Sequence, residues 1–409
     1  MRTYRELFRV PEFTPLFLMS AGQVGAQTVG GLALGTLIYS ATGSPLLSAL
    51  AMFGPSLAQV IGAATLLSAA DRLPPRATLA GTSLLFALGT AVLAVPGLPV
   101  GASFGVLFLL GTVASPVGGV RYGLLNEILE RDGYLLGRSV LNLCAGAAQI
   151  GGFAVGGLLV TTLSPRGTLL AGAALHLATA VVAYLGLSGR PPRTTGRPSP
   201  AETWRTNTLL WSSRPRRSVY LALWVPNGLI VGCESLFVAY APRYAGLLFA
   251  CGACGMLAGD VAVGRFVPRR WRGRLGVPLL LLLALPYPLL ALRPALPLVA
   301  AVVALASVGF AASLVLQERL MSLTPDELSG HALGLHTSGM LAMQGVGAAL
   351  AGGVAQLTSV PTAPAVMAVL SVTVTLTLAP GLRKRKGPAP SSGAPRAPRP
   401  TRAPRTPLP

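Results

Sequence analysis

The sequence predicts an all-α polytopic membrane protein with twelve transmembrane helices in two pseudo-symmetric six-helix halves. The chain of 409 residues is 52% hydrophobic and 11% charged, and its mean hydropathy is +0.64. A soluble protein of this size needs more polar residues to cover its surface. Apolar stretches of about 20 residues, the length that spans a bilayer core, also recur along nearly the whole chain.

The expected helices follow one another through short connections, apart from one long basic loop in the middle. Each has the length and the apolar character of a membrane span. The first six cover residues 15–38, 45–68, 77–96, 99–120, 138–161 and 167–188. The second six cover residues 217–240, 243–264, 275–292, 297–317, 331–357 and 361–380.

Basic residues fix the orientation of these helices. If the twelve segments alternate in direction, all but three of the 32 Lys and Arg residues lie on one side, and the exceptions are Arg166, Arg243 and Arg293. The positive-inside rule places the basic side, with both termini, in the cytoplasm. The net charge of +20 therefore indicates topology and contact with anionic lipids rather than with nucleic acid.

The composition also indicates where the protein resides. Arg outnumbers Lys 30 to 2, which is typical of a GC-rich genome and favours a bacterial inner membrane. Residues 1–9 are polar, and the first apolar stretch is long enough to span and lacks a cleavage-site pattern. We expect the first helix to act as its own insertion signal.

The chain divides into two helical halves, a linker and a tail. We expect an N-terminal six-helix bundle at 1–188 and a C-terminal one at 217–382. Residues 189–216 are rich in Pro, Arg, Ser and Thr, which predicts a cytoplasmic linker with little core of its own. Residues 383–409 are basic and Pro-rich, so we expect a disordered cytoplasmic tail.

One short sequence occurs in both halves at an offset of 193 residues. The shared residues are Arg72, Pro75 and Arg76, which recur as Arg265, Pro268 and Arg269. The same offset pairs Gly62 with Gly255, Gly137 with Gly330, Gly146 with Gly339, and Gly152 with Gly345. Two copies of one half in a membrane protein favour a transporter.

These features resemble the major facilitator superfamily, and within it the twelve-helix proton-driven exporters of drugs and metabolites. The resemblance covers residues 1–382 and includes the 6+6 layout, the basic central loop and the sequence Thr-Gly-Ser-Pro at 42–45. After the second helix the family has Gly-x-Leu-Ala-Asp-Arg-x-Gly-Arg-Arg, and here Ala70, Asp71, Arg72 and Arg76 match. Residues 152–157 keep the glycines of the exporter motif, with Phe153 in place of its Pro.

The resemblance implies a cytoplasmic gate in which acids pair with basic residues or with a helix N-terminus. Its candidate residues are Asp71, Arg72, Arg76, Arg121, Asp260, Arg265, Arg269 and Glu318. The two copies differ, because Gly264 stands where the first copy has its Asp, and Asp260 lies one turn earlier. The alternative is that these acids only cancel local positive charge.

Glu234 is the candidate for proton coupling. It is the one acid of twelve that falls well inside an apolar segment, in the outer half of the seventh helix. A carboxylate is costly there when charged, so it can take up and release a proton. The resemblance places this helix at the central cavity. The alternatives are a site for a cationic substrate, or a structural partner for a buried polar group.

Other polar residues inside the segments are candidates for lining the same cavity. They are Gln23, Gln27, Asn142, Gln149, Asn227, His336 and Gln344. Gln23 and Gln27 share one face of a helix at i and i+4, and for any single member interhelical hydrogen bonding is the alternative role. His176, in the sixth helix, is expected to be a structural histidine whose hydrogen bonds are satisfied.

The motifs exclude several classes of protein. No Gly-Lys-Ser or Gly-Lys-Thr phosphate loop is present, since the only lysines are Lys384 and Lys386 in the tail. No catalytic constellation is found, and Cys251-x-x-Cys254 lacks the further ligands of a metal site. We therefore expect neither an enzyme nor a cofactor or metal.

The sequence favours a monomeric secondary transporter that exports a small hydrophobic or amphiphilic molecule in exchange for protons, by alternating access. An uptake permease is the first alternative. A transport-inactive membrane partner protein is the second, because the family motifs match only in part.

Overall fold

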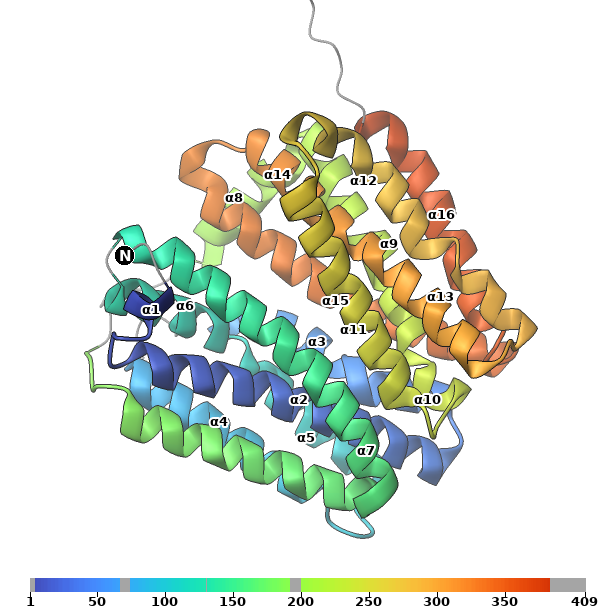
Figure 1. The fold of residues 1–409 in the computed structure, drawn as a ribbon, viewed down its shortest axis with the longest axis horizontal. Coiled ribbons are helices and arrows are strands. Elements are labelled where there is room, and N and C mark those ends of the chain that lie inside the picture. Colours follow the sequence, from blue (N-terminus) through green and yellow to red (C-terminus); the bar gives the residue numbers. More distant parts are fainter. Residues whose placement is uncertain (1–3, 67–73, 130, 192–199, 383–409) are drawn as a thin grey trace, which may run out of the picture.

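The computed structural model describes residues 4–66, 74–129, 131–191 and 200–382, and every regular element in these ranges is a helix. The helices form two groups, one from each half of the chain (Figure 1). The repeated loop at 67–73, which includes Asp71 and Arg72, lies outside the described residues, as does the tail at 383–409.

The N-terminal half begins with a short helix and continues with long ones. Its helices are α1 (Tyr4–Leu7), α2 (Phe13–Thr42), α3 (Pro45–Leu66), α4 (Pro75–Leu93), α5 (Val100–Ala114), α6 (Val117–Ile128) and α7 (Arg131–Gly186). Helix α2 ends at Gly43, whose φ of 63° lets its N–H bond the carbonyl of Tyr39 at 2.8 Å. The Thr-Gly-Ser-Pro sequence is thus a helix stop followed by a helix start.

Helix α7 contains two membrane passes. Ser164 has φ 77° and ψ 161°, and Pro165 follows it, so the helical path breaks there. The break falls between the two segments expected at 138–161 and 167–188. A sharp turn at this position brings the sixth pass back beside α2 and α4, against which α7 packs.

The C-terminal half contains more interruptions. Its first elements are α8 (Pro200–Ser212), α9 (Arg214–Ser235), α10 (Phe237–Tyr240), α11 (Ala245–Val261), the π-helix η2 (Ala262–Phe266) and α12 (Arg269–Ala284). The 3-10 helix η3 (Tyr287–Leu292), α13 (Leu296–Val308), η4 (Gly309–Ala311) and α14 (Ala312–Ser322) follow. The half ends with η5 (Asp326–Leu328), α15 (Ser329–Leu357) and α16 (Ala363–Leu382).

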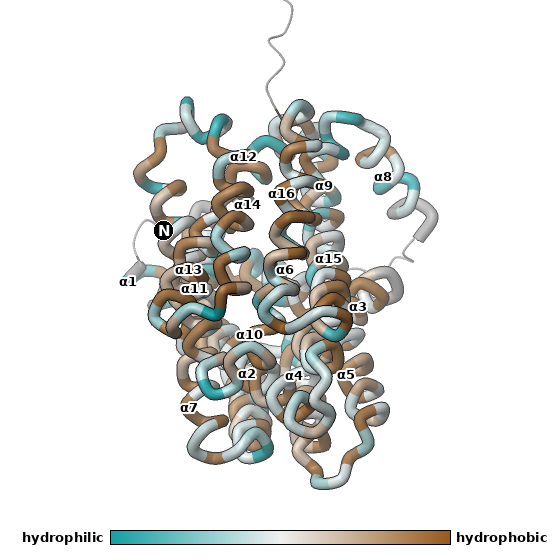
Figure 2. Tube along the Cα trace, turned by 90° about the vertical axis from the view of Figure 1, so that its right-hand side faces the viewer, coloured by the Kyte–Doolittle hydropathy of each residue, from teal (hydrophilic) through white to brown (hydrophobic). Residues whose placement is uncertain are grey.

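Ten helices of the described part are long and apolar enough to cross a membrane. One of them, Leu136–Gly186, is 51 residues long and holds the two passes that the Ser164 break separates. Helix α2, which is 30 residues long and contains the polar residues Gln23 and Gln27, provides a further pass and packs along α7. This arrangement is consistent with twelve passes, and hydrophobic residues run along their length (Figure 2).

Two parts of the chain differ from the sequence-based expectation. The fourth pass continues through α6 beyond its expected end at residue 120, so Arg121 lies within a helix and not in a loop. The linker contains α8, whose Leu210 is fully buried and whose Trp211 stacks on Trp224 at 5.6 Å. Helix α8 is therefore anchored on the C-terminal half.

The repeat predicted from the 193-residue offset is visible in the packing of one glycine pair. A Cβ on Gly62 would lie 2.4 Å from the carbonyl oxygen of Thr112, and a Cβ on Gly255 would lie 2.1 Å from that of Ala304. Each glycine lets its helix touch the backbone of the second pass after it. The two halves thus use the same close contact.

The substantial contacts between the halves pair α3 with α15 and α7 with α11. Near the expected outer end, Gly157 packs on Gly246, and Phe153 stacks on Phe249 with ring centroids 4.6 Å apart. At the same end, where α3 meets α15, Gln356 donates a hydrogen bond to Ser44 at 2.5 Å. In Figure 1 the two groups meet beside α10 and diverge toward the end that carries α8 and α14.

Candidate functional site

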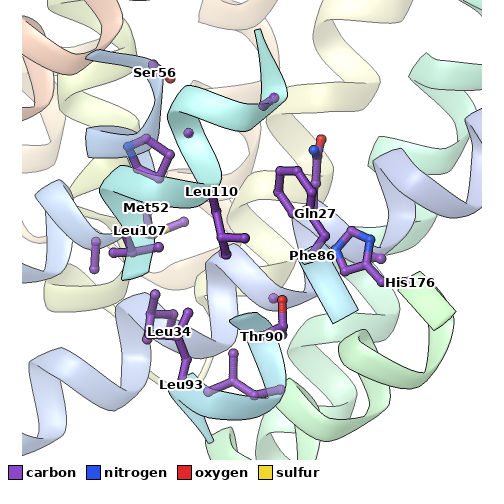
Figure 3. Close-up of a pocket in the computed structure, with 18 of the residues that line it drawn as sticks. Gln27, Leu34, Met52, Ser56, Phe86, Thr90, Leu93, Leu107, Leu110 and His176 are labelled. Atoms are coloured by element: carbon purple, nitrogen blue, oxygen red, sulfur yellow. The ribbon is translucent and has the colours of Figure 1, made fainter. Parts of the chain in front are cut away.

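The N-terminal half contains a partly open cavity of about 200 Å³ between α2, α3, α4, α5 and the second part of α7. Its wall is mainly apolar, with Met52, Phe86, Leu107 and Leu110 among its side chains (Figure 3). Five polar side chains interrupt this wall: Gln27, Ser56, Gln59, Thr90 and His176. A mostly apolar wall with a few polar groups is the usual character of a small-molecule site.

Gln27, which was predicted to line a central cavity together with Glu234, belongs to the wall of this cavity inside the N-terminal half. It is exposed although it lies in the middle of α2, and it is one of the residues that line the cavity (Figure 3). Gln23, one turn earlier, is 5% exposed, and its Oε1 has no hydrogen-bond partner in the described part of the chain. The two amides therefore differ in burial despite their i and i+4 spacing.

His176 also lines the cavity, and the expectation that its hydrogen bonds are satisfied is wrong. The side chain is 2% exposed and lies against Phe86, with ring centroids 5.2 Å apart. Its Nδ1 is buried without a partner among the described residues. A buried polar atom without a partner costs free energy, so this nitrogen is available to hydrogen-bond a ligand or a water in the cavity.

Glu234 lies near the end of α9, inside the C-terminal half. Its Oε1 would be 3.6 Å from a Cβ on Gly252 of α11, and Ser307 Oγ of α13 would be 3.3 Å from the same position. The hydroxyls of Tyr287 and Ser307 are the side-chain groups that interact with the carboxylate. Neither hydroxyl reaches good hydrogen-bond geometry, and Glu234 forms no ion pair in the described residues.

The offset of 193 residues relates the cavity to the surroundings of Glu234. Gln59 and Ala114 line the cavity, and their counterparts at this offset are Gly252 and Ser307. In the C-terminal half, Gly252 and Ser307 lie beside the carboxylate of Glu234.

The remaining predicted polar residues are dispersed. Asn142 is exposed and accepts a hydrogen bond from Tyr122 at 2.9 Å, and Gln149 and Gln344 are partly exposed. Asn227 is 7% exposed and His336 is 4% exposed. The Oδ1 of Asn227 and the Nδ1 of His336 lack partners in the described part, and none of these five residues lines the cavity.

The predicted gate residues that the structure describes do not pair with one another. Arg76 lies over the ring of Tyr184 at 4.2 Å, and Arg121 lies 5.0 Å from the ring of Tyr122. Asp260 and Arg265 take part in no ion pair among the described residues. The same is true of Glu318, which is exposed, and the side chain of Arg269 lies outside the described part.

A different ion pair, which sequence reasoning missed, links the segment before α2 to the segment after α7 at the basic end of the N-terminal half. Arg190 donates to the two carboxylate oxygens of Glu12 at 2.6 and 2.9 Å, and its Nε lies 3.7 Å from Glu127. Ser188 donates to Glu12 at 2.5 Å. Burial raises the pKa of Glu12, but the bonds from Arg190 and Ser188 outweigh it and hold that pKa below its usual value.

No group of three His, Cys, Asp or Glu side chains that could hold a metal ion occurs in the described ranges. Cys251 and Cys254 are both free thiols within α11. The chemistry that this arrangement offers is hydrogen bonding to a ligand and protonation of a carboxylate.

Comparisons with known proteins agree with this fold. The sequence model of the Major Facilitator Superfamily matches residues 16–317. No curated protein matches the chain by sequence.

Solved structures share the arrangement of helices over nearly their whole length. The nucleoside transporter NupG has a TM-score of 0.74 at 14% identity, over 91% of this chain and all of that one. A POT family transporter in complex with 5-aminolevulinic acid has a TM-score of 0.72 at 12% identity, over 91% and 96% of the two chains.

A bacterial homologue of the human lysosomal transporter Spinster, in an inward-facing and unoccupied conformation, has a TM-score of 0.65 at 14% identity. That match covers 93% of this chain and 97% of the other. At such identities the likeness shows the fold, whereas the sequence model shows the family over most of the chain. The protein is a multi-pass membrane transporter that belongs to the major facilitator superfamily.

Proposed function

We propose that the protein is a proton-coupled antiporter of a bacterial inner membrane that exports a small hydrophobic or amphiphilic molecule. The two halves rock about their shared interface, so that a substrate path between them opens to one side of the membrane at a time. The substrate is carried without chemical conversion.

The observation that carries the proposal is the environment of Glu234. Its carboxylate lies within a membrane-spanning helix, beside two hydroxyls and without an ion pair among the described residues. A charged carboxylate is costly in such a place unless it is paired, so binding and release of a proton is the exchange that it favours. The hydroxyls of Tyr287 and Ser307 would stabilise the charged carboxylate of Glu234 after the proton leaves.

The cavity supports the class of substrate. Its volume of about 200 Å³ exceeds the engineered apolar cavity of about 150 Å³ that takes up benzene. The wall is mostly Leu, Ala, Gly, Met and Phe, which favours an apolar body. Gln27, Thr90 and His176 supply hydrogen-bonding groups for one polar end. Among similar structures, the POT family transporter holds 5-aminolevulinic acid, a polar compound, whereas this wall favours apolar ones.

The contacts between the halves support the conformational cycle. They bring the halves together beside α10, where Gly157 meets Gly246, while the predicted gate residues at the basic end are unpaired in the described part. This arrangement supports a cycle in which the halves separate at the cytoplasmic end, from which a substrate for export would be loaded.

Proteoliposomes with a pH-sensitive dye trapped inside test the proposal. A panel of small amphiphilic compounds is added under an imposed pH gradient, and each compound is scored for the proton flux that it causes. We expect at least one compound to move protons in the direction opposite to its own movement. Co-movement of compound and proton would favour the uptake permease, and no flux with any compound would favour a transport-inactive partner protein.

A further inference from the structure

A groove outside the candidate substrate site lies between α12, α14 and α16. Its volume is about 770 Å³, and its wall includes Arg270 and Arg274 of α12 and Arg319 of α14. These helices gather at one end of the C-terminal half, away from α10 (Figure 2). By the positive-inside rule this basic end faces the cytoplasm.

Charged and apolar residues lie at different depths in this groove. Arg270 and Arg274 are in the first turns of α12, whereas Val277 and Pro278 follow along the same helix. With a rise of 1.5 Å per residue, Pro278 lies about 12 Å further along the helix axis than Arg270. The groove is thus basic at its mouth and apolar toward the middle of the membrane.

The basic residues of the mouth are placed to meet an anion. Arg270 and Arg274 are exposed, and the guanidinium of Arg274 lies 4.9 Å from the ring of Trp271. Arg319 donates hydrogen bonds to the carbonyls of Gly381 and Leu382, at the end of α16. No carboxylate is found among the described residues that line the groove.

We propose that this groove binds an anionic phospholipid of the inner leaflet. The phosphate of the headgroup lies between Arg270 and Arg274, and an acyl chain runs along Val277 and Pro278. Basic pockets between transmembrane helices on the cytoplasmic side are suited to such headgroups. The chain's own tail does not fit this site, because the sequence after Leu382 has eight basic residues and no acidic one.

Native mass spectrometry of the full-length protein in detergent tests the proposal, with phosphatidylglycerol as the probe. Wild type is expected to retain phosphatidylglycerol in preference to phosphatidylcholine. The double variant R270Q/R274Q is expected to bind it about 30-fold more weakly. Each arginine near a membrane surface strengthens binding of an anionic lipid by about fivefold. The matched control is R214Q/R217Q, which removes two exposed arginines outside the groove.

A second variant keeps both arginines and fills the space. A side chain on Gly273, which lines the groove, meets no atom within 4 Å, so G273L is expected to fold and to exclude the acyl chain. Gly264 also has free space around it and lies outside the wall, so G264L is the control. Melting temperatures of all variants without lipid show whether each is folded.

Each outcome bears on the proposal. Loss of phosphatidylglycerol in R270Q/R274Q and G273L, with both controls unchanged, supports it. The proposal is overturned if R214Q/R217Q loses as much phosphatidylglycerol as R270Q/R274Q does. It is also overturned if R270Q/R274Q retains as much phosphatidylglycerol as the wild type. Displacement of the lipid by glycerol phosphate or inorganic phosphate at equal concentration would show a soluble-anion site, which also overturns the assignment to a lipid.

Discussion

Gly157 of α7 and Gly246 of α11 touch backbone to backbone where the two halves of the transporter meet. A Cβ on Gly157 would lie 2.9 Å from the Cα of Gly246, and a Cβ on Gly246 would lie 2.5 Å from that of Gly157. Phe153 and Phe249 stack beside this contact. Any larger side chain must push the halves apart, so this pair of glycines sets how closely they approach.

We expect Gly157→Val to slow transport by opening this contact. Overpacking of a close contact costs about 1–3 kcal/mol, which lowers the population of the state that the contact stabilises by about fivefold to about 140-fold. Transport by proteoliposomes and labelling of an engineered cysteine from the α10 side measure the effect. Gly151→Val is the control, because a Cβ there meets nothing within 4 Å. Equal rates for both variants would contradict the role of the contact.

Filling the cavity of the N-terminal half should block substrate binding. Gly31 lines the cavity and a Cβ there meets no atom within 4 Å, so Gly31→Leu adds volume inside without a backbone clash. We expect substrate-induced proton flux to fall at least about fivefold, since extra methylene groups in a packed site cost about 1 kcal/mol or more. Gly81→Leu adds the same volume in free space on α4. Unchanged flux in Gly31→Leu would place the substrate elsewhere.

The ion pair between Arg190 and Glu12 should stabilise the protein in a pH-dependent way. Its side chains are 26% and 20% exposed, so we expect Glu12→Gln to lower the free energy of unfolding by about 1 kcal/mol at neutral pH. The pKa of Glu12 is lowered in the folded state. Its contribution is therefore complete above the unfolded pKa of about 4.3 and is lost as the pH falls through the lower, folded value.

Thermal unfolding in detergent at pH 7 and at about pH 3 measures this linkage. The difference between wild type and Glu12→Gln should be present at the higher pH and shrink at the lower one. Glu318→Gln on α14, an exposed acid outside this ion pair, is the control for loss of a carboxylate. A difference that is equal at both pH values would show that the carboxylate charge of Glu12 does not matter.

The repeated glycines Gly62 and Gly255 should tolerate substitution equally poorly. Alanine at either position puts a methyl group within 2.4 Å of a facing carbonyl oxygen, so we expect each variant to lose about 1–3 kcal/mol of stability. Gly54→Ala is the control, since its Cβ meets nothing within 4 Å. Melting temperatures compare the three variants, and a marked difference between Gly62→Ala and Gly255→Ala would contradict equivalent packing in the two halves.

Hydropathy and the distribution of arginines were sufficient to predict the fold class, because a bilayer imposes the length of each span and the side of each basic loop. The break in α7 fell between two expected segments, where Ser164 and Pro165 interrupt the helix. The predicted end of the fourth pass at residue 120 was wrong, because α6 continues through Arg121. The guanidinium of Arg121 lies over the ring of Tyr122. A hydropathy pattern ends a span at the first charged residue and takes no account of the aromatic ring that follows it in the chain.

The surroundings of the candidate residues were harder to predict, since they come from distant parts of the chain. Glu234 was found as an acid inside an apolar segment, but nothing in its own helix indicates Tyr287 or Ser307. Arg190 reaches Glu12 across 178 residues. The offset of 193 residues contained a usable signal, because it relates Gln59 and Ala114 of the cavity to Gly252 and Ser307.

The most direct test of the central proposal is transport by Glu234→Gln in proteoliposomes, with a compound that wild type exports. We expect exchange of labelled for unlabelled compound without a pH gradient to persist, because glutamine keeps the shape of the protonated acid. Accumulation driven by a pH gradient should be lost, since glutamine carries no exchangeable proton. Accumulation at the wild-type rate in Glu234→Gln would show that Glu234 is not the proton carrier.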